Sequence, residues 1–198
     1  MKELCYPLNN EYIIKNKKKI RKFLLEQDNL VEKRIAILGG STTNDVIQVL
    51  ELFLLNNGIK PVFYESEYNS YFEDAVFDSS KLDDFKPELI YVYTTNRNIL
   101  VYPKINMSSL DVDRMLEEEF NKYKLIWDSL INKYNVPIIQ NNFELPLYRI
   151  MGNMDCYDFH GNVNYICRLN QKFNECAYNN KNLYINDINY ISSYYGLD

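Results

Sequence analysis

The chain of 198 residues carries 22 basic and 27 acidic side chains, a formal net charge of −5, and 46% hydrophobic residues. This mix is typical of a folded globular protein and excludes a disordered or collagen-like chain. The acidic balance argues against nucleic-acid binding, and no run approaches the roughly 18 apolar residues of a membrane span. Because residues 1–10 also lack the apolar stretch of a secretory signal, we expect a cytoplasmic protein that binds neither nucleic acid nor membrane.

Cysteine and histidine content limits the possible chemistry. The four cysteines, Cys5, Cys156, Cys167 and Cys176, form no C-x-x-C pair, so a zinc ribbon or thioredoxin-type motif is absent. We expect them to be reduced, buried cytosolic thiols. His160 is the single histidine, which excludes a His-rich metal site. We therefore expect neither a metal nor a cofactor.

Strand and helix patterns alternate along the chain. Residues 15–27 predict a basic amphipathic helix, which we interpret as a solvated cap formed by residues 1–33. Apolar runs of buried-strand type follow at 34–38, 60–64, 88–93, 136–140 and 183–188. Helical spacing lies between and after them, at 46–54, 65–72, 111–133 and 163–173, with a short helix near 195. The segment 97–110 has no clear period.

Five alternations at this spacing predict an α/β fold over residues 34–198. The expected architecture is a three-layer sandwich with a central, mostly parallel five-stranded sheet covered by helices on both faces. Ligands of such sheets bind at the carboxyl ends of the strands. The candidate site is therefore sought among the polar residues that directly follow each strand.

The most specific of these segments is Gly39-Gly40-Ser41-Thr42-Thr43-Asn44-Asp45, which joins the first strand to a helix. Glycines permit close backbone approach, and free N–H groups at a helix start favour an anion or a developing oxyanion. We expect Ser41 to face the ligand crevice, with Gly40, Thr42 and Asn44 around the ligand. In the competing structural interpretation, Ser41 or Thr42 only caps the helix.

This segment resembles the opening block of FkbH-like proteins, whose N-terminal domain has an SGNH-hydrolase fold. Similar blocks recur in the same order at 63–65, 87–92, 139–146 and 183–187, so the resemblance extends over most of residues 34–198. In this family, which belongs to the haloacid-dehalogenase superfamily, a phosphatase-type domain follows. We therefore expect the chain to be cut before such a domain, which becomes one expected partner.

The resemblance also implies a reaction. Ser41 matches the nucleophile, and Asn96 in Thr94-Thr95-Asn96 matches the residue that donates a hydrogen bond to the oxyanion. Asn69 is the nearest small polar residue to the position of a glycine in SGNH enzymes. The implied activity is transfer of an acyl (glyceryl) unit through Ser41 to the thiol of an acyl or peptidyl carrier protein, the second expected partner.

The pattern departs from SGNH enzymes in its general base. Those enzymes carry Asp-x-x-His after the last strand, but none lies between Asp187 and Asp198, and His160 precedes the fifth strand. A serine without a base is a poor nucleophile, so whether the chain is an enzyme stays open. Two alternatives remain: a non-catalytic docking module for the carrier protein or phosphatase domain, and an SGNH-type esterase or deacetylase.

A second polar group follows the fourth strand. Asn141, Asn142 and Arg149 combine strand-end amides with a guanidinium, a set that suits a carboxylate, phosphate or sugar-acid ligand. We treat Asn142 and Arg149 as candidate substrate-binding residues. The alternative is a loop held by amide–backbone hydrogen bonds, with Arg149 in an ion pair.

Overall fold

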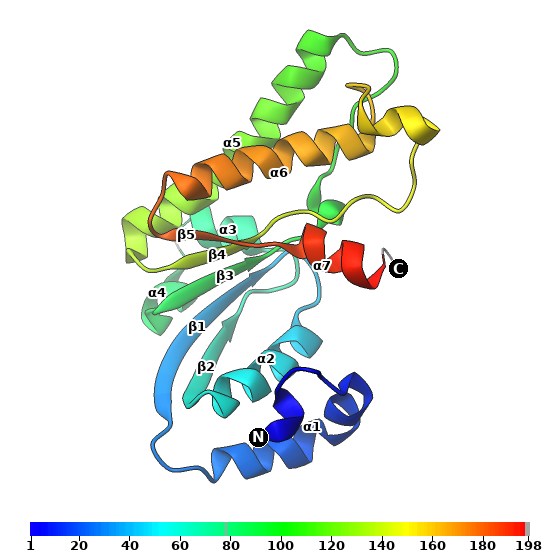
Figure 1. Ribbon diagram of the computed structural model, residues 1–198. Coiled ribbons are helices and arrows are strands. Elements are labelled where there is room, and N and C mark those ends of the chain that lie inside the picture. Colours follow the sequence, from blue (N-terminus) through cyan, green and yellow to red (C-terminus); the bar gives the residue numbers. More distant parts are fainter. Residues whose placement is uncertain (78, 197–198) are drawn as a thin grey trace.

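The computed structural model describes residues 1–77 and 79–196, and at its centre lies one five-stranded sheet (Figure 1). Its strands are β1 (Val31–Gly39), β2 (Ile59–Glu65), β3 (Leu89–Tyr93), β4 (Ile138–Asn141) and β5 (Leu183–Asn186). All pair in parallel, in the order β2-β1-β3-β4-β5. The α/β class and the parallel sheet predicted from the sequence are confirmed. The expected domain end at residue 198 lies outside the described residues.

Seven α-helices are found in the described part of the chain. They are α1 (Asn10–Leu25), α2 (Asn44–Asn56), α3 (Tyr71–Val76), α4 (Ser80–Phe85), α5 (Ser109–Tyr134), α6 (Asn162–Tyr178) and α7 (Ile188–Tyr195). Short 3-10 helices occur at Lys2–Leu4, Asn96–Asn98 and Gly152–Cys156. None of the described helices is long and apolar enough to cross a membrane.

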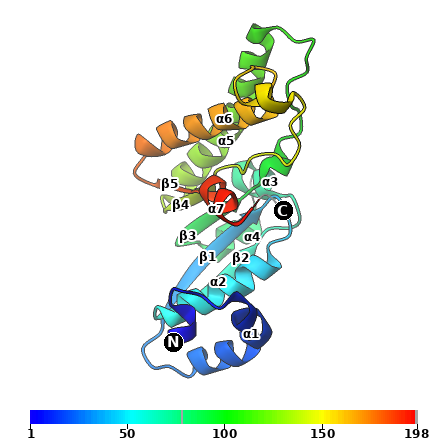
Figure 2. The ribbon, with the colours of Figure 1, turned by 45° about the vertical axis from the view of Figure 1, so that its right-hand side comes forward.

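The strand order determines which face each helix covers. The chain steps from β1 outward to β2 and then back across the sheet to β5, so right-handed crossovers send α2 to one face and α3 to α6 to the other. Figures 1 and 2 show α5 and α6 on one side of the sheet and α2, backed by α1, on the other. The carboxyl ends of all five strands consequently meet at one edge.

The larger core lies between the sheet and the layer of α5 and α6. It is aromatic: Trp127 and Phe173 stack edge to face with ring centroids 4.8 Å apart, and Tyr123 lies 5.0 Å from Phe173. A buried polar contact crosses this core, because the Trp127 indole donates to Gln140 Oε1 at 3.0 Å. A smaller core joins α1 to α2, so the cap packs directly on the sheet domain.

Several element boundaries differ from the sequence prediction because side-chain caps determine where the helices start. Asn9 accepts a hydrogen bond from the Tyr12 amide, which starts α1 at residue 10 rather than 15. Asp187 accepts from the Tyr190 amide and ends β5 at residue 186 rather than 188. The helix expected over 65–72 begins only at Tyr71, after Asn69 turns the chain with φ of +59°.

Candidate functional site

The turn after β1 is held by both neighbouring strands. The Gly39 amide donates to the Ser66 hydroxyl after β2 at 2.8 Å, and the Gly40 amide donates to the Tyr93 carbonyl at the end of β3 at 2.8 Å. The buried Thr43 hydroxyl donates to Glu65. Because each contact comes from the carboxyl edge of the sheet, the turn has a defined position there before α2 begins.

Asn98 connects this turn to the loops after β2 and β3. Its side-chain amide nitrogen donates to the Gly40 carbonyl at 2.8 Å and to Asn69 Oδ1 at 3.3 Å, while its Oδ1 accepts from the Thr95 amide at 2.9 Å. A Cβ on Gly40 would lie 2.5 Å from the Asn98 nitrogen. Glycine is therefore required at position 40 so that the Asn98 side chain can approach the backbone.

Ser41 is half-buried at the surface of this turn. Neither its hydroxyl nor the backbone amides of Ser41 and Thr42 have a hydrogen-bond partner within residues 1–77 and 79–196. Both amides precede Thr43, the N-cap residue of α2, so they belong to the turn and not to the helix. The turn thus combines a half-buried hydroxyl with two backbone N–H donors that have no partner among the described residues.

The two asparagines after β3 point to different neighbours. The Asn96 side chain donates to the carbonyls of Glu144 and Leu145 at 3.2 and 3.4 Å, and the Asn96 amide faces the Glu144 carboxylate at 3.3 Å. Asn96 therefore fastens the loop after β4, whereas Asn98 contacts the Ser41 turn. Asn98 was not among the site residues predicted from the sequence. Its signal is the second asparagine of Thr94-Thr95-Asn96-Arg97-Asn98, whose side chain completes a capping box with Thr95.

The remaining candidates have mainly structural contacts. Asn142 donates to Asp187 at 2.8 Å and accepts from the Asn189 amide at 3.0 Å, which ties the end of β4 to the start of α7. Asn44 Oδ1 accepts from Gln48 one turn later in α2. Arg149 is exposed and has no ion-pair partner in the described part of the chain. The structure thus brings Gly40, Asn69 and Asn98 together, and it does not bring Asn142 or Arg149 into contact with them.

His160 is engaged away from the turn. Its Nδ1 lies 2.8 Å from Asp158 Oδ1, and its Nε2 lies 3.0 Å from the Met107 carbonyl. The hydrogen bond to the Met107 carbonyl, followed by that to Asp158, raises the pKa of His160 above its ordinary value. With both ring nitrogens occupied, His160 fastens the 97–110 segment to the loop before α6.

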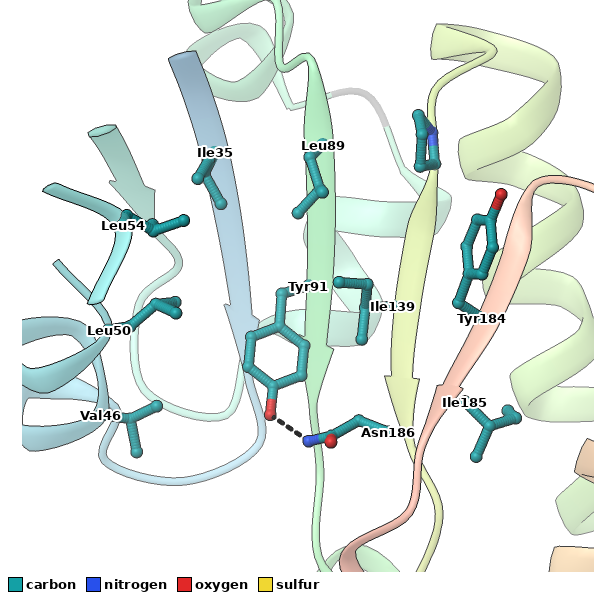
Figure 3. Close-up of a pocket in the computed structure, with 11 residues that line it drawn as sticks. Ile35, Val46, Leu50, Leu54, Leu89, Tyr91, Ile139, Tyr184, Ile185 and Asn186 are labelled. Atoms are coloured by element: carbon teal, nitrogen blue, oxygen red, sulfur yellow. Dashed lines mark hydrogen bonds between the residues drawn. The ribbon is translucent and has the colours of Figure 1, made fainter. Parts of the chain in front are cut away.

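Beside the turn, part of the sheet face on the α2 side is open. α2 covers β1 and β2, while a groove of about 730 Å³ lies between α2 and the exposed sides of β3, β4 and β5 (Figure 3). Leu89, Ile139 and Tyr184 form its apolar wall. At its carboxyl-edge end the Tyr91 hydroxyl accepts from Asn186 at 3.0 Å, and burial raises the pKa of Tyr91 to about 12.

These features define the class of protein. The strand order 2-1-3-4-5 is that of flavodoxin-like, doubly wound sheets, and the candidate site is a serine turn at the carboxyl edge. The family model described as "FkbH, N-terminal domain" matches residues 34–198. The chain therefore belongs to the FkbH N-terminal domain family, as its resemblance had indicated.

Comparison with solved structures agrees on the fold. The chain is similar to the crystal structure of the N-terminal part of the protein BF1531 from Bacteroides fragilis, described as containing a phosphatase domain complexed with Mg. The match has a TM-score of 0.74 and 18% identity, and covers 91% of this chain and 47% of the other. The chain thus spans about half the length of that crystallised chain. No functionally curated protein matched the sequence.

Proposed function

We propose that this domain transfers an acyl unit, as implied for a glyceryl group in the FkbH-like family, to the thiol of a carrier protein through Ser41. The observation that carries the proposal is the Ser41 turn itself. Its hydroxyl is unpaired among the described residues, and two free backbone amides lie beside it. We propose that a phosphatase-type domain like the one present in BF1531 works beside this domain. The phosphatase-type domain then acts on the phosphate of the acyl donor, and the domain that carries Ser41 acts on the donor's carbonyl group.

The proposed chemistry has two steps. The Ser41 oxygen attacks the carbonyl of an activated donor of the acyl phosphate class, the C–O bond to phosphate breaks, and the hydroxyl proton passes through solvent to the departing phosphate, which leaves an acyl-serine. The carrier thiol then attacks this ester and returns the proton to Ser41. In both steps charge develops on the carbonyl oxygen, where the Ser41 and Thr42 amides can donate; each such donor contributes about 3–4 kcal/mol of transition-state stabilisation in known acyl-transfer enzymes.

The oxyanion role expected for Asn96 is better suited to Asn98 in this proposal. Asn98 adjoins the turn through the Gly40 carbonyl, and release of its weaker contact with Asn69 (3.3 Å) frees one N–H for the substrate. Asn96 then acts as a positioning residue that keeps the loop after β4 in place. Asn69 lies next to Asn98, and its side-chain oxygen accepts one of the Asn98 N–H bonds. In this proposal the substrate carbonyl replaces Asn69 as the acceptor of that hydrogen bond.

The test uses a serine-reactive fluorophosphonate, which modifies an activated serine without any carrier protein. We expect a mass increase located at Ser41 by peptide mapping, and no increase in Ser41→Ala. Acyl loading of the carrier by the protein together with its phosphatase-type domain should likewise be lost in Ser41→Ala. Undiminished loading by that variant would contradict a role for Ser41 as nucleophile.

One observation favours the alternative of a non-catalytic docking module. Within the described residues no carboxylate or imidazole contacts the Ser41 hydroxyl, and both N–H bonds of the Asn98 amide already have acceptors. A protein that folds and binds the carrier, but shows no fluorophosphonate modification and no loading, would support docking over catalysis. Hydrolysis of p-nitrophenyl acetate that disappears in Ser41→Ala would instead support an esterase.

A further inference from the structure

Positive charge is concentrated on α1, outside the part of the chain that the family model matches. This helix holds six of the 22 basic residues and a single acidic one, Glu11, although the chain as a whole is acidic. The matched region begins at residue 34, so the family gives no role for this helix. The charge therefore requires its own explanation.

Four of these basic side chains form one stripe. Lys15, Lys18, Lys19 and Lys22 have the spacing i, i+3, i+4, i+7 of one helix face, and all four are exposed. The opposite face packs on α2 through buried Ile13, Ile20 and Leu24. Within the described residues, Lys15 pairs only with exposed Glu11, and Lys18, Lys19 and Lys22 have no ion-pair partner. Three of the four lysines thus present charge to solvent without an acidic partner among the described residues.

The start of α1 lies at the same end of the domain as Ser41. Lys17 Nζ is 3.4 Å from Asp45 Oδ1 at the start of α2, and Arg21 Nε is 2.7 Å from Glu51 further along. The two helices therefore run in the same direction, and α1 begins near the carboxyl edge of the sheet. Since Asp45 follows Ser41 by four residues, the N-terminal turns of α1 lie at the end of α2 that follows the Ser41 turn.

Apolar side chains flank the charges. Ile14 is 59% and Phe23 53% exposed, and their positions on the helix place them on opposite sides of the lysine stripe. Protein interfaces combine an apolar anchor with complementary charge at the rim. A polyanion without apolar groups would bind through the lysines alone. A folded acidic protein would also contact the exposed side chains of Ile14 and Phe23.

We infer that the outer face of α1 is the docking surface for the acidic carrier protein whose thiol receives the acyl group from Ser41. The inference rests on the proposed function for the identity of the partner. Charge complementarity selects a carrier with a carboxylate-rich surface, and the parallel packing of α1 on α2 places the Lys15 end of the stripe toward the end of the domain that carries the Ser41 turn. Docking by charge accelerates association at low ionic strength and weakens with salt.

The test measures binding of a fluorescently labelled, acidic holo acyl carrier protein to the chain by anisotropy, at low and high ionic strength. The stripe variant carries Lys15→Glu, Lys18→Glu, Lys19→Glu and Lys22→Glu. A control with the same change in net charge carries Lys81→Glu, Lys104→Glu, Lys124→Glu and Lys181→Glu, four exposed positions outside α1. Thermal melts confirm that both variants fold.

We expect the stripe variant to bind at least about tenfold more weakly at low ionic strength, and the control to bind within about twofold of the wild type. Equal binding by stripe variant and wild type, or an equal loss in the control, overturns the inference. Binding of the wild type to phosphatidylserine vesicles but not to the carrier also overturns it and identifies a membrane surface.

The result separates docking from catalysis. Fluorophosphonate modification of Ser41 requires no carrier. If Ser41 is modified but the protein does not bind the carrier, the docking inference is contradicted and the nucleophile proposal is not. Stripe-dependent binding by a protein whose Ser41 is unmodified supports docking and contradicts the nucleophile.

Discussion

The Asn98 side chain lies against the Gly40 backbone, with its amide nitrogen 2.8 Å from the Gly40 carbonyl oxygen. These residues are 58 positions apart in sequence, and their contact joins the loop after β3 to the turn that carries Ser41. The contact depends on the absence of a side chain at residue 40. The geometry of the candidate site therefore depends on Gly40 and Asn98 together, and neither residue indicates this contact by its own position in the sequence.

The first prediction compares the two asparagines after β3. Asn98→Ala removes the contact with the Ser41 turn and leaves the buried Gly40 carbonyl unpaired, so we expect a loss of about 1–3 kcal/mol in the free energy of unfolding. Fluorophosphonate modification of Ser41 should slow at least about tenfold. Asn96→Ala, which disturbs the loop after β4, should leave the modification rate close to that of the wild type. The reverse order of effects would restore the oxyanion role to Asn96.

A second prediction concerns Gly40 itself. Gly40→Ala places a methyl group 2.5 Å from the Asn98 nitrogen, so Asn98 must move, and we expect destabilisation of about 1–3 kcal/mol. In the double variant Gly40→Ala/Asn98→Ala the clash is absent. Urea unfolding of the two single variants and the double variant should therefore show strong non-additivity. Additive losses would show that the two side chains do not compete for this space.

The third prediction tests the buried polar contact behind the site. Gln140 is fully buried, accepts from the Trp127 indole at 3.0 Å and donates to the Thr94 hydroxyl at 2.9 Å. Gln140→Leu leaves the indole N–H without an acceptor, and we expect unfolding to be easier by about 1–3 kcal/mol. Exposed Gln171→Leu is the matched control and should change stability by less than about 0.5 kcal/mol. Similar values for both would refute the role of Gln140.

A pH dependence follows from His160. Its pKa is raised by its hydrogen bonds to the Met107 carbonyl and Asp158, so the folded state holds the proton more tightly than the unfolded state. This stabilisation is complete below the ordinary histidine pKa of about 6.5 and is lost as pH rises through the raised value. The melting temperature of the wild type relative to His160→Gln should therefore fall between about pH 5.5 and about pH 8.5. A difference that is constant or rises with pH would contradict this.

Much of the fold could be predicted from the sequence because each strand and helix is encoded by its own local pattern. Apolar runs such as 34–38 lie inside β1, and the 111–133 period lies inside α5. The boundaries were less accurate, because caps such as Asn9 and Asp187 depend on one side-chain hydrogen bond. The family, too, could be identified from the order and spacing of short blocks.

The sequence by itself determined the α/β class, the parallel sheet and the serine turn at a strand end, since these depend on periodicity and on neighbouring residues. Only the tertiary structure decided which distant side chain reaches that turn. Asn96 and Asn98 are two positions apart, yet the short 3-10 helix sends one amide toward the loop after β4 and the other to Gly40. The different directions of these two side chains cannot be predicted from composition or spacing. They are fixed by contacts among the loops after β1, β3 and β4, which only the folded sheet brings together.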